Sequence, residues 1–416
     1  MDTIKASLYG FQQRLKHRQA HTADRSQQIF YEVMLKYYQM VDKGREEGRP
    51  LAWVGLAPVE IVYAMDILPF MPEFQCMVVA SQGNIAGYFD ASAGYGLPIE
   101  ICSVHRAMTG MDILQELPKP DLILSSACVC DSTLKFYGTR TEYHQVPSYM
   151  LDLPHWRDEE AIQYLTKDLE GMVHFLEEFT GKKMDYDRLK EIMRLSKEGY
   201  DLFYEIGELR KAAPTPLRAR EAFRNFSVWA FMLGKQEAID YFRLMRDETR
   251  RRVENKEGAV ADEKYRIVWL YIPPNYALSV FDWMETEYGA TIPMDVFNFL
   301  GEFEWDPDKP LETLARKAYY SLLIRQLGGP IENATDEAVR MVKEYKADGA
   351  VWLTQIGCKQ GCAVIRRMKD VLQEELGVPF LSMDGDVIDP SVLPPDELKS
   401  KLEGFFEILE DRVAVH

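Results

Sequence analysis

The pattern of apolar and polar residues divides the chain into helical stretches and stretches with short buried strands. In residues 1–48, apolar side chains recur at helical spacing among charged ones, which predicts helix. These apolar residues are Ile4, Leu8, Phe11, Leu15, Ile29, Val33, Leu35 and Tyr38. The sequence Gly48-Arg49-Pro50 ends the pattern. We therefore expect an N-terminal helical segment over residues 1–48.

Short apolar runs that alternate with helical patterns follow this segment. Residues 51–55 and 121–126 are predicted as buried strands. Residues 58–65 are predicted as a helix, because Pro58 stands near its first turn. Continuous apolar strands between helices favour a parallel, doubly wound sheet. We place a first α/β domain at residues 49–154.

Residues 155–260 are rich in charge and carry no strand signal. Their apolar residues follow a long helical period, as in Leu165, Leu169, Val173, Leu176 and Phe179. We predict a helical domain here. The run Arg250-Arg251-Arg252 near its end is interpreted as a solvated helix face, with partner docking as the alternative.

The α/β pattern returns in residues 261–416, which we assign to a second α/β domain. Strands are predicted at residues 265–271, 349–354 and 378–383, and a closing helix at residues 395–411. The expected fold class is α/β, with two doubly wound parallel-sheet domains facing each other, N-terminal helices and a helical insert. No repeat at a fixed period of 20–50 residues is present, but the two α/β halves could share an architecture.

Length and charge exclude several classes of protein. A chain of 416 residues is too long for one compact core. Its net charge of −17 argues against binding to nucleic acid or to anionic membranes. The sequence has no apolar run of about 18 residues and no apolar core of a signal peptide after Met1, so we expect a cytoplasmic protein.

The six cysteines are the candidate chemistry of this chain. They are Cys76, Cys102, Cys128, Cys130, Cys358 and Cys362. Cys130 and Cys358 each follow a predicted strand in a different half, and ligands of open α/β sheets bind beyond the carboxyl ends of strands. If the two sheets face one another, these thiols meet at one point, as an iron–sulfur cluster would require.

Local spacing leaves three interpretations of these cysteines open. Cys358 and Cys362 would share one face of a helix whose N-terminus suits an anionic cluster, and Gly357 and Gly361 allow a close backbone approach. The alternatives are ordinary buried cysteines and structural zinc. Paired CxxC motifs of zinc sites are missing, and so is the bacterial ferredoxin spacing.

The residues around the cysteines resemble the 2-hydroxyacyl-CoA dehydratase and benzoyl-CoA reductase superfamily. The segments that carry the resemblance are 55–61 (GLAPVEI), 97–103 (LPIEICS), 127–132 (ACVCDS), 357–362 (GCKQGC) and 377–386 (GVPFLSMDGD). The resemblance implies two α/β domains with helical parts and a [4Fe-4S] cluster held by Cys102, Cys130 and Cys358. It also implies an ATP-hydrolysing iron–sulfur activator that donates a low-potential electron.

The three remaining cysteines depart from the three-cysteine pattern of that superfamily. Cys128 stands beside Cys130, Cys362 stands beside Cys358, and Cys76 is the third. Six thiolates could hold two cubanes that share a sulfide, so the chain looks like the double-cubane cluster branch, with an [Fe8S9]-type cluster and a homodimer. A single [4Fe-4S] cluster is the alternative. Cys76 is the weakest candidate, because residues 74–79 could be a strand with a core thiol.

Several other residues are candidates near this site. His105, Arg106 and Lys359 are the candidate catalytic residues, as donors of protons or hydrogen bonds. Gln360, Ser125 and Ser126 could tune a cluster, whereas turn chemistry suffices for Asp384 and Asp386. The glycines from 83 to 96 lack phosphate-loop spacing and predict a flexible loop over the cluster, so we expect ATP to bind the partner.

Three functions remain open at this point. The first is an oxygen-sensitive reductase that takes electrons from the ATP-dependent activator and reduces a small molecule. The second is a subunit of a 2-hydroxyacyl-CoA dehydratase or benzoyl-CoA reductase, which would need a different partner subunit. The third is an electron carrier without substrate chemistry.

Overall fold

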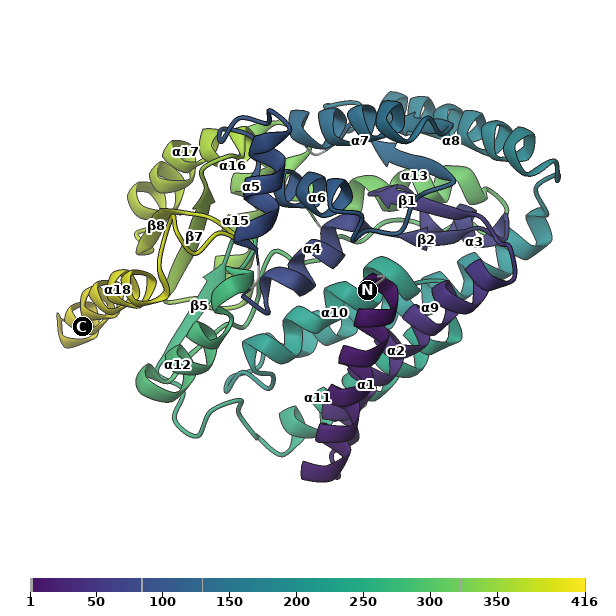
Figure 1. Ribbon diagram of the computed structural model, residues 1–416. Coiled ribbons are helices and arrows are strands. Elements are labelled where there is room, and N and C mark those ends of the chain that lie inside the picture. The colour runs from purple at the N-terminus through teal and green to yellow at the C-terminus, as the bar shows by residue number, and fades with distance from the viewer. Residues whose placement is uncertain (1–2, 84, 129, 322, 416) are drawn as a thin grey trace.

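The computed structural model describes residues 3–83, 85–128, 130–321 and 323–415 (Figure 1). The chain begins with an antiparallel pair of helices, α1 (Thr3–His21) and α2 (Arg25–Glu46). Asp24 caps α2, because its carboxylate accepts a hydrogen bond from the backbone N–H of Ser26. The predicted helical character of the N-terminal segment is confirmed, with a break between the two helices.

The first sheet has four parallel strands in the order β2-β1-β3-β4. The strands are β1 (Leu51–Gly55), β2 (Leu68–Phe70), β3 (Leu122–Ser126) and β4 (Ser148–Leu151). The helices in this part are α3 (Val59–Ala64), α4 (Pro72–Ala80), α5 (Ala86–Gly94), α6 (Ser103–Ile113) and α7 (Asp131–His144). Consecutive residues of β1, such as Trp53 and Val54, belong to different apolar clusters on opposite faces of the sheet. Burial of both faces explains the continuous apolar runs.

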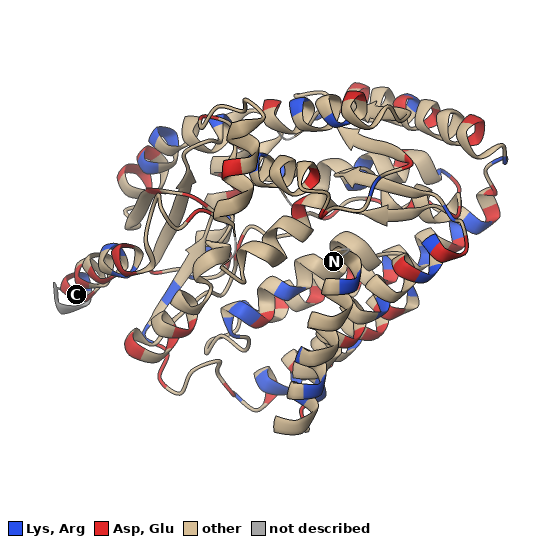
Figure 2. Ribbon diagram, in the orientation of Figure 1, with Lys and Arg blue, Asp and Glu red and all other residues tan. Residues whose placement is uncertain are grey.

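Four long helices follow: α8 (Glu159–Thr180), α9 (Tyr186–Leu209), α10 (Ala219–Met232) and α11 (Gln236–Glu254). The expected helical character of this region is confirmed. Arg250 and Arg251 form surface ion pairs, but Arg252 is largely buried and binds Glu221 of α10. The solvated-face interpretation is therefore wrong for Arg252, which joins two helices. Figure 2 shows acidic and basic residues spread together over these helices.

The second sheet repeats the topology of the first, with the order β6-β5-β7-β8. Its parallel strands are β5 (Tyr265–Trp269), β6 (Ala290–Thr291), β7 (Gly349–Gln355) and β8 (Phe380–Gly385). The accompanying helices are η1 (Asn275–Ala277), α12 (Ser279–Tyr288), α13 (Pro310–Tyr320), α14 (Ile324–Leu327), α15 (Ile331–Glu344), α16 (Lys359–Ala363), α17 (Ile365–Lys369), the π-helix η2 (Asp370–Glu375) and α18 (Pro395–Val415). The predicted fold class is confirmed, and the shared strand order makes the two halves architectural relatives.

Two expectations about local structure are wrong, and one alternative is excluded. The alternative was a strand at residues 74–79, but this apolar run lies in α4, where Pro72 occupies the first turn. The glycine-rich segment expected to be a loop contains helix α5. Asp384 lies in β8 rather than in a turn after it. No described helix is long and apolar enough to cross a membrane.

Helix α13 lies against α8 although the two are far apart in sequence. Leu311, Leu314, Ala315 and Tyr319 of α13 share an apolar cluster with residues of the first sheet and of α8. Ion pairs from Arg316 to Glu159 and Glu312 border this contact. The later part of the chain thus returns to cover the first sheet.

Candidate functional site

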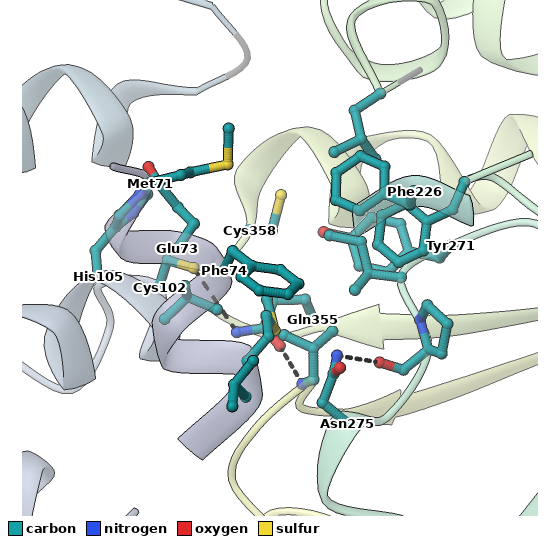
Figure 3. Close-up of a pocket in the computed structure, with 18 of the residues that line it drawn as sticks. Met71, Glu73, Phe74, Cys102, His105, Phe226, Tyr271, Asn275, Gln355 and Cys358 are labelled. Carbon is teal, nitrogen blue, oxygen red and sulfur yellow. Dashed lines mark hydrogen bonds between the residues drawn. The ribbon is translucent and has the colours of Figure 1, made fainter. Parts of the chain in front are cut away.

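Three cysteines, Cys102, Cys130 and Cys358, line one cavity of about 410 Å³ between the two halves of the molecule. Figure 3 labels two of them, Cys102 and Cys358. Each of the three stands immediately before the first residue of a helix: Cys102 before α6, Cys130 before α7 and Cys358 before α16. The N-termini of α6 and α7 direct their dipoles toward this cavity, which favours negative charge there. The Cys358 sulfur also accepts a hydrogen bond of 3.3 Å from the backbone N–H of Gly361. Backbone geometry thus favours thiolates at this point.

The loops that carry these thiols touch each other across the two halves. A Cβ atom on Gly357 would lie 3.0 Å from the Cα of Cys102, so only glycine permits this approach without displacing the backbone. Tyr271, which is buried two residues after the end of β5, donates a hydrogen bond from its hydroxyl to the Cys358 sulfur. The structure thus brings Cys102, Cys130 and Cys358 together from both halves, as the positions of Cys130 and Cys358 after strands predict.

A buried hydrogen-bond network lies beside Cys102 and also joins the two halves. Asp386 accepts hydrogen bonds from the Ser103 hydroxyl (2.7 Å) and from the Gln355 amide (3.0 Å). The same Gln355 nitrogen lies 2.8 Å from the Ser103 oxygen and 4.0 Å from the Cys102 sulfur. Asp386 also accepts from the backbone N–H groups of Ile388 and Asp389. Asp386 therefore orders the loop after β8 and holds it against the start of α6.

Burial governs the protonation of these thiols. Burial raises the pKa of Cys102, and the neighbouring Cys130, Cys358 and Asp386 raise it further. Burial also raises the pKa of Cys358, although Tyr271 and the Gly361 N–H lower it in part. Buried thiolates need a positive partner, and soft metals are the partners that thiolates prefer.

Among the described residues, no three His, Cys, Asp or Glu side chains are placed to hold one metal ion. The three thiols do border a common cavity, and thiolates are the ligands of iron–sulfur clusters. The chemistry of these donors therefore fits an iron–sulfur cluster.

The three other cysteines each lie near one of the cavity cysteines. Cys128 is buried and lines a second cavity of about 400 Å³ together with Cys130. Burial raises the pKa of Cys128 to about 12, although Arg157 nearby lowers it in part. A Cβ atom on Gly328 would lie 2.4 Å from the Cys128 sulfur, so this thiol packs directly on the backbone of the loop after α14.

Cys76 and Cys362 line neither of these cavities. Cys76 is fully buried in α4, with its sulfur 3.8 Å from the Val104 carbonyl oxygen, and it is close enough to Cys102 for the two to interact electrostatically. Cys362 is exposed and interacts in the same way with Cys358. The six thiols thus form three neighbouring pairs: 76 with 102, 128 with 130, and 358 with 362.

His105 lies in the cavity wall, whereas Arg106 does not. The Nδ1 atom of His105 is 2.7 Å from the Ser132 hydroxyl, and its ring stacks on Phe136. Burial lowers the pKa of His105 to about 4, so the ring is neutral near pH 7. Arg106 binds the Ile99 carbonyl oxygen and stacks over Phe89.

The remaining polar candidates differ in how deeply they are buried. Lys359 is exposed and forms a 3.0 Å ion pair with Asp131 at the cavity rim, which again joins the two halves. Gln360 borders both cavities. Ser125 and Ser126 are buried in β3, and Ser126 donates to the Cys128 carbonyl oxygen. Asp384 is exposed, whereas the turn chemistry expected for Asp386 is only part of its buried network.

Sequence reasoning missed one carboxyl group in the cavity. Glu73 of α4 lines the cavity (Figure 3), and its carboxylate accepts a hydrogen bond from the Tyr137 hydroxyl of α7, which lies 2.7 Å from each of its oxygens. Burial raises the pKa of Glu73 to about 7, although Tyr137 lowers it in part. Its only sequence signal is a carboxylate in the first turn of a helix, which occurs in many surface helices.

These observations define a class: two parallel sheets of one topology whose strand ends bring thiols to a shared cavity. A family model described as 2-hydroxyglutaryl-CoA dehydratase, D-component, matches residues 55–409, which include all six cysteines. The chain belongs to this family, and the resemblance noted in the sequence is confirmed. Membership supports an enzymatic role.

Individual relatives align over most of the chain. The chain is 24% identical over 404 residues to the (R)-2-hydroxyisocaproyl-CoA dehydratase alpha subunit of Clostridioides difficile, covering 92% of this chain and 96% of that protein. It is also 24% identical over 383 residues to a benzoyl-CoA reductase subunit of Thauera aromatica, covering 85% and 87%. The similar proteins thus include both dehydratase and reductase subunits.

Proposed function

We propose that this chain is an iron–sulfur reductase that receives low-potential electrons from an ATP-hydrolysing [4Fe-4S] activator and reduces small molecules in the cavity. The observation that carries the proposal is the meeting of Cys102, Cys130 and Cys358, from both halves, around one cavity. The family membership and the helix N-termini behind two of these thiols support it. The alternative without metal, three ordinary core thiols, leaves the convergence unexplained.

A double-cubane [Fe8S9]-type cluster is the proposed form of the centre. The support is the second cysteine beside each cavity cysteine, because the two sets of three match the six thiolates of such a cluster. Cys76, Cys128 and Cys362 would form the second set. Helices α4 and α16, which carry Cys76 and Cys362, would have to shift for these two thiols to reach a common point, since neither lines the cavity.

A single [4Fe-4S] cluster in a dehydratase or benzoyl-CoA reductase subunit is the second candidate. The relatives named above favour it, and so does the cavity, which is lined by three cysteines in its described part. This candidate requires a different partner subunit, whereas the double-cubane proposal implies a homodimer. A carrier without substrate chemistry has no use for a 410 Å³ cavity with apolar walls.

The residues of the chain would prepare this cavity for reduction. When bound, the cluster would supply electrons. Phe74 and Phe226 line the cavity with apolar surface and exclude water. Glu73 holds a proton close to neutral pH, whereas His105 is neutral and its Nδ1 atom lies beside Ser132. Glu73 is thus a better candidate than His105 for supplying protons.

Iron and acid-labile sulfide analysis of anaerobically purified protein tests the proposal. Two cubanes predict about eight irons per chain and one cubane about four. Replacing Cys358 by Ser should remove most of the iron of a single cubane and about half of the iron of two cubanes, whereas Cys128→Ser or Cys362→Ser should lower the iron, again by about half, only for the double cubane. Protein prepared without oxygen that contains no iron would refute both forms. Purification as a homodimer would favour the reductase over the heteromeric dehydratase.

A further inference from the structure

The cavity extends away from the thiols to a group of cationic side chains. Arg14 of α1 and Arg224 of α10 line it together with Tyr31 of α2. The guanidinium carbon of Arg224 lies 5.4 Å from the centre of the Tyr31 ring, and its Nη2 donates a 3.4 Å hydrogen bond to the Tyr31 hydroxyl. The guanidinium carbon of Arg18 lies 5.9 Å from the same ring centre. Three arginines thus lie near one phenol.

These arginines have no carboxylate partner among the described residues, which is unusual in this protein. The chain has 66 acidic and 49 basic residues besides histidine, so acidic partners are in excess. Arg220, one helical turn before Arg224 and also in the cavity wall, is paired with Asp282. Burial alone would raise the pKa of Tyr31, but Arg224, Arg18 and Arg14 together lower it. The local potential is therefore positive.

The walls between the arginines and the thiols are apolar and aromatic. They are formed by Phe11, Phe30, Phe74, Phe223, Phe226 and Leu327, among others. A volume of about 410 Å³ lies in the range of cavities that hold drug-sized molecules. Such walls favour an apolar body, and unpaired guanidinium groups favour an anionic end.

Charge also orients a ligand in this space. The acidic groups that line the cavity, Glu73, Glu100 and Asp131, all lie on segments next to the cysteines, where Asp131 is paired with Lys359. Lys135, which is exposed, is the other cation on that side. The acidic groups thus disfavour an anionic group near the thiols, and Arg14 and Arg224 favour it at the far end, around Tyr31.

We propose that Arg14, Arg224 and Tyr31 bind the anionic group of a small amphipathic molecule whose apolar part lies along the phenylalanine wall toward the thiols. The ligand class is an organic carboxylate or phosphate ester. That this ligand is a substrate rests on the proposed function, whereas its binding does not. Paired guanidinium and anionic groups form strong, charge-assisted hydrogen bonds, and the wall adds burial of apolar surface.

Calorimetry on the full chain tests this with three probes of similar apolar part: 3-phenylpropionate, phenyl phosphate and the neutral 3-phenylpropanol. At least one anion should bind about tenfold more tightly than the alcohol, with an affinity that falls as salt rises. The anion that binds more tightly identifies the head group. Equal binding of the anions and the alcohol would overturn the proposal, and this comparison needs no variant.

Variants locate the binding site. Arg224→Gln and Arg14→Gln should each weaken anion binding about tenfold and leave the alcohol unchanged. Arg220→Gln is the matched control, since this arginine lines the same cavity but is already paired with Asp282. An unchanged anion affinity in Arg224→Gln would also overturn the proposal.

The same titration in Cys358→Ser separates this proposal from the reductase function. Anion preference that persists in this iron-poor variant supports the arginine site by itself. Iron-loaded protein without anion preference would refute the site and leave the reductase proposal standing.

Discussion

At the scale of single residues, burial determines which groups in the cavity keep their protons. Glu73 is the clearest case, because a carboxyl group that would be ionised in water lies between α4 and α7, where its hydrogen-bond partners are a neutral hydroxyl and a backbone N–H. The thiols of Cys102 and Cys358 respond to burial in the same direction. Burial in this cavity therefore favours the protonated, neutral forms of the carboxyl and thiol groups unless a cation binds beside them.

Glu73→Gln should change how stability depends on pH. Burial raises the pKa of Glu73 to about 7, so the folded protein keeps this proton between about pH 4.5 and pH 7 while the unfolded chain loses it. The stabilisation from neutral Glu73 is complete below pH 4.5 and is lost as pH rises through 7. Between pH 4.5 and pH 7, the free energy of unfolding of the iron-free wild type should fall by roughly 3 kcal/mol relative to that of the Gln variant.

Urea unfolding from pH 4.5 to 8 measures this difference between the two proteins. Tyr137→Phe is an informative companion, because Tyr137 lowers the pKa of Glu73 and its removal should move the transition to higher pH. A wild-type-minus-variant difference that stays constant over the range would contradict the prediction.

Some site residues could be predicted from the sequence because their neighbouring residues mark them, whereas others are defined only by contacts with distant residues. Cys102, Cys130 and Cys358 stand in recognisable segments after strands, so their meeting could be expected. Glu73 and Tyr271 could not be found in this way. Their roles depend on contacts with residues 64 and 87 positions away, and nothing in their own neighbourhoods marks them.

At the scale of elements, a close helix crossing positions the first cavity thiol. Helices α5 and α6 pack so closely that a Cβ atom on Gly110 would lie 2.0 Å from the Tyr88 carbonyl oxygen. Because backbone cannot rotate away as a side chain does, only glycine fits there. Helix α6 begins directly after Cys102, so this crossing also determines where that thiol stands.

Gly110→Ala should therefore lower the free energy of unfolding by about 3 kcal/mol, since α5 must move away from α6. Iron content should fall with it if Cys102 is a ligand. Gly87→Ala in α5 is the control: nothing lies within 4 Å of its added methyl group, so stability should stay the same or rise slightly. Urea unfolding of both variants measures this, and equal stabilities would rule out the close crossing.

The longer strands could be predicted from the sequence, whereas the shortest could not. Strands β1, β3, β5 and β7 have five to seven continuous buried residues and were all expected. Strands β2, β4 and β6 have only two to four residues, too few for any pattern. In α4 the apolar run suits either a strand or a helix, and only Pro72 in the first turn distinguishes them.

At the scale of the whole molecule, polar contacts at the strand ends join the two halves, in addition to the apolar packing that they share. The Asp386 network and the ion pair between Lys359 and Asp131 both cross this boundary. The proposed ligands Cys102 and Cys130 lie on one side of it and Cys358 on the other. A cluster held by all three would act as a further cross-link between the halves, available only in the folded protein.

Removing the iron should therefore destabilise the whole chain and not just its cysteine loops. A group that binds the folded state but not the unfolded one adds its binding free energy to stability, so anaerobic treatment with a chelator should lower the melting temperature by roughly 5 °C or more. Cys358→Ser should melt below the iron-loaded wild type, and its melting temperature should change less on chelation. If chelation removes the iron and leaves the melting temperature of the wild type unchanged, the cysteines of the two halves do not hold a common group, because a cross-link between halves cannot be lost without weakening the fold that it joins.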